Sequence, residues 1–136
     1  MGYLGRRMSI TEEGINGERL AYKCLANLNI ICFGGDWIIK GPKTNKWYVV
    51  EVKHHAGFNP PPFYGNGTDI SIIKRRLQFQ EDTGIKTILL WINKDDNEIY
   101  WNFLEDLEKG SKFNTNNNIR IYPKDNYKLK ESLLKL

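Results

Sequence analysis

The sequence predicts an α/β fold in which a central mixed β-sheet is flanked by helices. Residues 36–40 and 47–53 are rich in Ile, Val, Trp and Tyr and are separated by turn residues, which is typical of a β-hairpin. Residues 11–29 and 68–83 carry apolar side chains at helical spacing. Residues 88–92 form a continuous apolar run, as in strands that are covered on both faces. Together, these patterns indicate a single α/β domain over residues 1–136.

The amino-acid composition of the chain limits the classes of protein to which it can belong. The chain has 20 Lys and Arg against 16 Asp and Glu, a net charge of +4, which favours a polyanionic partner without requiring one. Cys24 and Cys32 lack the spacing of a zinc site and are expected to be reduced core residues. No apolar run is long enough to span a bilayer, and no secretory signal follows Arg6 and Arg7. We therefore expect a cytoplasmic protein without membrane contact.

The first predicted helix follows a basic arm, residues 1–10. Thr11 supplies a hydroxyl N-cap, and acids follow it in the first turn. On a helical wheel Glu18 lies within about 20° of Leu25, at the margin of the apolar stripe. Two interpretations stay open for Glu18: an ion pair with Arg19 or Lys40, or an acid of a functional site. A short strand over residues 30–33 then leads to the hairpin.

The hairpin gathers charged residues at one end. If Lys40 faces Trp47 across the turn, Asp36 lies opposite Glu51 with the two Cβ atoms about 5 Å apart. Lys53 shares the face of Glu51 because side chains alternate along a strand. Like charges directly opposite each other destabilise a sheet, so this arrangement predicts a bound divalent cation.

A long segment, residues 54–67, is expected to be a loop with a functional or mobile role. His54, His55 and the neighbouring aromatics would contact nucleic acid, or the aromatics would fold back over the core. In the second helix, residues 68–83, the basic cluster 74–76 would contact phosphates or face solvent. Gln80 falls inside the apolar stripe of that helix, about 20° from Ile73.

The remaining elements are short. Residues 88–92 and 98–103 are expected to be strands, with the first in the centre of the sheet. Residues 104–109 are expected to form a helix that ends at Gly110, and residues 111–118 an irregular segment. An edge strand is expected over residues 118–122 and a small amphipathic helix over residues 127–136.

Two of these motifs resemble those of a known family. Asp36 followed by Glu51-Val52-Lys53 on the next strand resembles the core of the PD-(D/E)XK nuclease superfamily. Residues 14–19, Gly-Ile-Asn-Gly-Glu-Arg, resemble its first-helix motif and are also similar to nuclease-related domains. Within the superfamily, the layout over residues 14–104 is most similar to archaeal-type Holliday junction resolvases. Gly35 stands where a proline often precedes the family's aspartate.

This resemblance implies a restriction-endonuclease-like core and a site for Mg²⁺, with Mn²⁺ as a substitute. It makes Asp36 and Glu51 direct ligands with the Val52 carbonyl as a third, and Glu18 a ligand of a second metal or of a metal-bound water. Lys53 would hold the attacking water, and Gln80 would be a glutamine that lies near the metal. The candidate contacts to nucleic acid are Arg6, Arg7, Arg19, His54, His55, Lys74, Arg75 and Arg76.

The function implied by the resemblance is a metal-dependent endonuclease that hydrolyses phosphodiester bonds in branched or duplex DNA. A homodimer is expected because two strands must be cut. Two alternatives remain: another nuclease on the same core, such as a nicking, restriction-like or host-defence enzyme, or a non-catalytic module that binds nucleic acid or protein. Asp36, Glu51 and Lys53 argue against the non-catalytic module, because binding alone has little need of this charged group.

Overall fold

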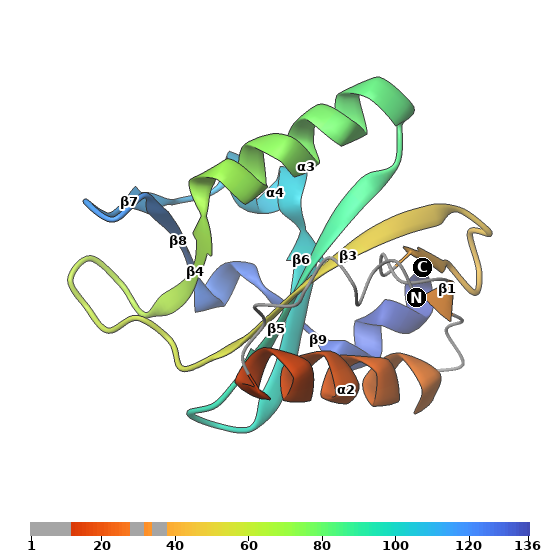
Figure 1. Cartoon of the computed structure of the whole chain (residues 1–136), viewed down its shortest axis with the longest axis horizontal. Helices are drawn as coiled ribbons and strands as arrows, with labels where there is room; N and C mark the ends of the chain where they lie inside the picture. Colours follow the sequence, from red (N-terminus) through yellow and green to blue (C-terminus); the bar gives the residue numbers. More distant parts are fainter. Residues whose placement is uncertain (1–11, 28–31, 34–37) are drawn as a thin grey trace.

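A computed structural model of the protein describes residues 12–27, 32–33 and 38–136 (Figure 1). In this part of the chain a six-stranded mixed sheet has the order β1-β2-β3-β5-β6-β9, and a three-stranded antiparallel sheet has the order β4-β8-β7. Helix α2 lies on one side of the larger sheet, and α3 and α4 lie on the other (Figure 1). The predicted α/β class with a mixed sheet is confirmed. No helix of the described residues is long and apolar enough to cross a membrane.

The strands of each sheet and the helices have the following bounds. The larger sheet contains β1 (Cys32–Phe33), β2 (Ile38–Lys40), β3 (Trp47–His55), β5 (Lys86–Asn93), β6 (Glu98–Phe103) and β9 (Lys128–Leu129). The smaller sheet contains β4 (Gly65–Asp69), β7 (Phe113–Asn114) and β8 (Ile119–Pro123). The α-helices are α2 (Glu12–Asn27), α3 (Ile70–Thr83) and α4 (Leu104–Lys109), and two 3₁₀ helices are η1 (Lys124–Asn126) and η2 (Lys130–Lys135).

Strand β5 organises both cores. It pairs in parallel with β3 and antiparallel with β6. Because side chains alternate along a strand, Ile88 and Leu90 pack toward α2, whereas Leu89 and Trp91 pack toward α3 and α4. The predicted central strand, covered on both faces, is confirmed.

The hairpin of β2 and β3 has the predicted register. Lys40 lies opposite Trp47, and Ile38 lies opposite Val49. Asp36 is outside the described residues, so its place opposite Glu51 stays a prediction. Strand β3 continues to His55, beyond the predicted end at residue 53, because it pairs with β5 along its whole length from Tyr48 onward.

Helix α2 lies close against β3 at one glycine. A Cβ atom built on Gly17 would overlap the Cβ of His54, so only glycine lets the helix backbone come this near to the strand. The sequence identifies Gly17 only as part of the family motif. The structure gives this residue a packing role.

We predict that Gly17→Ala destabilises the protein although alanine is the better helix former by about 1 kcal/mol. The overlap with His54 forces the helix away from the sheet, and such overpacking typically costs about 1–3 kcal/mol. Urea unfolding of Gly17→Ala and of the wild type measures the difference in the free energy of unfolding. His54→Ala should not rescue Gly17→Ala, because the overlapping atom is the Cβ that alanine keeps, whereas His54→Gly should rescue part of the loss. Equal stability of Gly17→Ala and the wild type would contradict this packing.

The predicted loop over residues 54–67 is wrong at its two ends, because residues 54–55 belong to β3 and residues 65–67 to β4. Residues 65–69 form β4, which pairs along its length with β8, and helix α3 begins only at Ile70. Gly65 and Gly67 are buried there, and both positions require glycine because a Cβ at Gly65 would strike the Tyr122 carbonyl and one at Gly67 would strike the Phe58 ring. The glycine-rich sequence of β4 therefore does not predict a strand, although its glycines are needed to let neighbouring groups come close to the strand backbone.

Three further expectations near the C-terminus differ from the structure. Strand β8 lies in the middle of the smaller sheet rather than at an edge, because both β4 and β7 pair with it. The segment 111–118, expected to be irregular, contains the short strand β7. Residues 127–136 form β9 and a 3₁₀ helix instead of an amphipathic α-helix, since the Trp101 indole donates to the Leu129 carbonyl and the Ser132 hydroxyl.

Candidate active site

The candidate site begins with two charged residues of β3. Glu51 and Lys53 project from the same face of the strand, toward α3, and the Lys53 Nζ lies 3.7 Å from a Glu51 carboxylate oxygen. The Arg76 Nε, from α3, donates a 3.0 Å hydrogen bond to the other oxygen. The side chains of Glu51 and Lys53 are only 13% and 18% exposed, so the acid and lysine are partly desolvated and held together.

Asp69 adds a second acid near Lys53. It is the N-cap of α3, and its carboxylate accepts hydrogen bonds from the Ser71 amide at 2.8 Å and the Ser71 hydroxyl at 2.7 Å. These hydrogen bonds hold the pKa of Asp69 below its usual range, and the charge of Lys53 acts in the same direction. No local signal in the sequence joins Asp69 to this site, because the sequence does not predict strand β4 or its approach to β3.

Two threonine hydroxyls complete this region. Thr68 of β4 and Thr87 of β5 face a closed space beside Glu51 and Arg76 that is too small to admit a water molecule, and both threonines are 1% exposed. Neither hydroxyl oxygen has a hydrogen-bond partner among the described residues. An unpaired buried hydroxyl costs about 1–3 kcal/mol, and it is expected where a ligand or an ion supplies the missing contact. We call the residues Glu51, Lys53, Thr68, Asp69, Arg76 and Thr87 the Glu51 site.

The predicted glutamine has a different partner. The Gln80 amide nitrogen donates a 2.7 Å hydrogen bond to Glu105 of α4, whose other oxygen lies 2.7 Å from the Lys86 Nζ. The hydrogen bond from Lys86, aided by that from Gln80, keeps the pKa of Glu105 below its usual range. Gln80 lies one helical turn beyond Arg76, but no contact between it and Glu51 is seen in the described part of the chain.

The predicted metal ligands are only partly described. Asp36 and the side chain of Glu18 are outside the described residues. Helix α2, which carries Glu18, packs on the face of β3 opposite to that of the Glu51 carboxylate. The role of Glu18 as a ligand stays a prediction. Val52 points its side chain toward α2.

The Glu51 site contains oxygen atoms of the type that a hard cation such as Mg²⁺ prefers as ligands. The described residues contain no group of three or more His, Cys, Asp or Glu that could hold a metal ion. The Glu51 carboxylate and the unpaired hydroxyls of Thr68 and Thr87 are nevertheless oxygen donors, which Mg²⁺ prefers. A complete magnesium site here would need further carboxylates, and Glu18 and Asp36 are the predicted source.

The predicted basic cluster of α3 divides between two roles. Lys74 and Arg75 are exposed, whereas Arg76 turns inward to Glu51. Arg19 is exposed on α2, and Arg6 and Arg7 are outside the described residues. Lys74, Arg75 and Arg19 therefore remain accessible to a polyanion, while Arg76 belongs to the Glu51 site.

The two histidines are held by the protein itself. The ring nitrogens of His55 lie 2.9 Å from the Ala56 carbonyl oxygen and 3.2 Å from that of Gly67, and His54 packs against Gly17. Tyr64, from the segment after them, packs on the Trp91 ring with centroids 6.0 Å apart. Tyr64 therefore folds back over the core, whereas Phe58 is 40% exposed, and contact of the two histidines with nucleic acid stays a prediction.

Comparison of the chain with protein-family models, with curated proteins and with solved structures gave no match. The assignment of a function therefore rests on the chemistry of the Glu51 site and on the sequence motifs that predicted it.

Proposed function

We propose that the protein is a metal-dependent DNA endonuclease with a restriction-endonuclease-like core and that the Glu51 site hydrolyses phosphodiester bonds. The observation that carries this proposal is the pairing of Glu51 with Lys53 on one face of β3 at 3.7 Å, beside Arg76. The order of motifs in the sequence fits a structure-selective enzyme that acts on branched DNA, and the need to cut two strands fits a homodimer.

Each group of the site has a role in this proposal. The Lys53 ammonium holds the attacking water and offsets negative charge that builds on the scissile phosphate. Arg76 provides a second cation for the phosphate oxygens. Glu51, with Glu18, Asp36 and the Val52 carbonyl, would hold Mg²⁺, which supplies Lewis-acid stabilisation and a lowered pKa of bound water when present.

One observation favours a second candidate, a non-catalytic nucleic-acid-binding module. The Glu51 carboxylate already has two cationic partners, Lys53 and Arg76, and such a network can hold β3 and α3 together without any chemistry. In that case the exposed cations Arg19, Lys74 and Arg75 would bind nucleic acid through charge alone.

A panel of DNA substrates distinguishes these candidates. The purified protein is incubated with a four-way junction, a flap, a single strand and a plain duplex of matched sequence, in Mg²⁺ and in EDTA. We expect cleavage in Mg²⁺ alone, with the four-way junction cut fastest. Preferred cutting of plain duplex would indicate another nuclease on this core, and binding without cleavage of any substrate would favour the module. The same panel in RNA tests the choice of nucleic acid.

We predict that Thr87→Val lowers the cleavage rate about tenfold, as loss of a supporting contact to a site ligand does. Valine matches threonine in shape and removes an unpaired buried hydroxyl, so the free energy of unfolding should stay equal or rise. Single-turnover cleavage and urea unfolding measure the two effects. An unchanged cleavage rate with raised stability would show that the Thr87 hydroxyl serves no ligand.

A further inference from the structure

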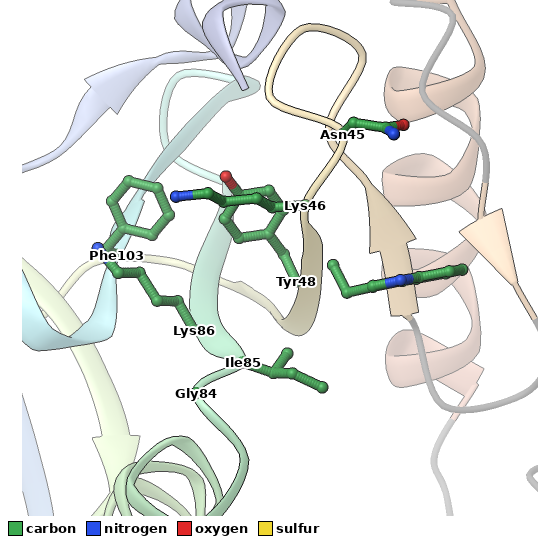
Figure 2. Close-up of a pocket in the computed structure, with 8 residues that line it drawn as sticks. Asn45, Lys46, Tyr48, Gly84, Ile85, Lys86 and Phe103 are labelled. Atoms are coloured by element: carbon green, nitrogen blue, oxygen red, sulfur yellow. The ribbon is translucent and has the colours of Figure 1, made fainter.

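A groove of about 390 Å³ opens where β3 and β5 begin and α3 ends (Figure 2). Its walls include Lys46, Trp47, Tyr48, Lys86 and Phe103. Volumes of about 300–1,000 Å³ are usual for sites that hold small molecules or single groups of larger ones. None of these residues belongs to the Glu51 site, and the family motifs do not include them.

Aromatic rings form much of the groove. The Trp47 side chain is 44% exposed, which is unusual for the largest side chain in a protein. The rings of Tyr48 and Phe103 lie with centroids 5.8 Å apart and beside each other in Figure 2. Tyr48 is only 5% exposed and projects from the face of β3 opposite to that of Trp47, so the open ring at this groove is that of Trp47. Flat apolar rings at an open surface are suited to stacking against a planar ligand.

Lysines surround these rings. Lys46 and Lys86 line the groove, and the Lys86 Nζ lies 5.2 Å from the centroid of the Phe103 ring while it pairs with Glu105. The Lys40 Nζ lies 5.5 Å from the centroid of the Trp47 ring, and the Lys128 Nζ lies 5.9 Å from that of Phe103. The groove therefore combines stacking surfaces with positive charge.

This combination matches one class of ligand. Stacking of bases on aromatic side chains beside cations that follow the phosphates is how proteins bind single-stranded nucleic acid. A paired base inside a duplex cannot reach such rings without leaving the stack. A small inorganic anion would use the lysines but would leave the exposed Trp47 ring unexplained.

The position of the groove connects it with the Glu51 site. Trp47 and Glu51 lie on the same face of β3, four residues apart, and the strand rise of about 3.3 Å per residue places their Cα atoms about 13 Å from each other. A few nucleotides of one strand can span this distance. A strand held in the groove could therefore also present a phosphate to Lys53.

We infer that this groove binds one unpaired nucleotide of a DNA strand, with the base stacked on the exposed Trp47 ring and the adjacent phosphates at Lys40 and Lys46. The inference deepens the proposed function, on which it rests for the choice of DNA as substrate. It makes the preferred substrate one with unpaired nucleotides close to the cleaved bond, such as a flap or a junction whose bases open at the branch point.

The chain offers a closely matched control for the test. Lys46→Ala/Trp47→Ala removes an adjacent lysine and aromatic residue from the groove, and Lys112→Ala/Phe113→Ala removes the same pair of types at β7. Trp47 and Phe113 are equally exposed, at 44% each. The two double variants thus lose the same charge and a similar exposed ring at different places.

Binding is measured by fluorescence anisotropy with a ten-nucleotide oligothymidylate and with a blunt duplex, in EDTA so that no cleavage occurs. We expect the groove variant to lose at least about tenfold in affinity for the single strand, consistent with one stacked base, and less than about threefold for the duplex. The control variant should bind both as the wild type does. In the wild type the oligonucleotide should also quench tryptophan fluorescence, and Trp47→Phe should lose the quenching but keep the affinity.

Three results would overturn the inference: unchanged affinity of the groove variant for the single strand, an equal loss for single strand and duplex, or an equal loss in the control variant. Thermal melting checks the fold, and Trp47→Leu, which keeps apolar bulk without a ring, replaces the double variant if that does not fold. Cleavage is measured separately, with the wild type in Mg²⁺. Binding in the groove without any cleavage would therefore refute the nuclease proposal and leave the groove assignment standing.

Discussion

Replacement of Lys53 by methionine is expected to reduce DNA cleavage by about 10²–10³-fold, the usual effect of removing one group that stabilises charge in a transition state. Methionine keeps the length and apolar character of the lysine stem but removes the ammonium group. Because Arg76 still holds Glu51 at 3.0 Å, the site should keep its shape and the protein its fold. Single-turnover cleavage of the four-way junction measures the rate.

The prediction also requires that Lys53→Met slows DNA cleavage but leaves metal binding unchanged. Calorimetry should find binding of Mg²⁺ or Mn²⁺ largely intact in Lys53→Met, since the lysine is not a proposed ligand. Lys124→Met is the matched control, because Lys124 also pairs with an acid, Asp96 at 3.3 Å, but lies elsewhere. Cleavage by Lys53→Met at a rate close to that of the wild type would remove the lysine from the mechanism.

The largest effect on stability is expected for Trp91→Ala, about 3–5 kcal/mol. Trp91 is fully buried in β5 and packs against the rings of Tyr100 and Tyr127, with centroids 5.7 Å and 5.5 Å away. Its indole also donates a 3.0 Å hydrogen bond to the His55 carbonyl, which would lose that partner. This loss is a large part of the roughly 5–15 kcal/mol that stabilises a typical domain.

Urea unfolding at fixed pH measures the change through the midpoint and slope. Trp47→Ala serves as the comparison, since it removes the same side chain from an exposed position and should cost less than about 1 kcal/mol. Similar losses in the two variants would mean that Trp91 does not anchor the core between β5, α3 and α4.

The parts of the fold that the sequence predicts well are those where apolar side chains carry the pattern. The run of residues 88–92 predicts a central strand, and β5 contains it with both faces covered. The hairpin register follows from the turn chemistry and from apolar residues on both arms, and Lys40 does face Trp47. Residues 104–109 predict a short helix with the bounds of α4.

The parts that it does not predict depend on tertiary contacts. Strand β4 reads Gly-Asn-Gly-Thr-Asp, a composition poor in strand-forming residues, and it exists because β8 pairs with it and because its small residues allow close approach. The 3₁₀ turn of residues 130–135 similarly depends on the Trp101 indole, which holds it by hydrogen bonds.

The candidate site likewise has residues that the sequence predicts and residues that only tertiary contacts bring together. Alternation along one strand is enough to place Glu51 and Lys53 on one face, and their contact is seen. The sequence groups Arg76 with Lys74 and Arg75 as a basic cluster. Arg76 nevertheless lies three residues after the buried Ile73 and four before Gln80, which places it on the inner side of α3. Thr68, Asp69 and Thr87 carry no such local signal, because β4 and β5 bring them to the site only in the folded protein.

The central claim, that a metal-dependent hydrolytic site is built around Glu51, is tested most directly by the cleavage of a four-way junction by the wild type, Glu51→Gln and Glu105→Gln in Mg²⁺ and in EDTA. Glu105 is a suitable control because it is also a partly buried, ion-paired acid on the same side of the sheet. The account predicts cleavage by the wild type and Glu105→Gln in Mg²⁺, none in EDTA, and none by Glu51→Gln. Cleavage by Glu51→Gln at the wild-type rate, or no cleavage of any DNA by the folded wild type, would contradict it.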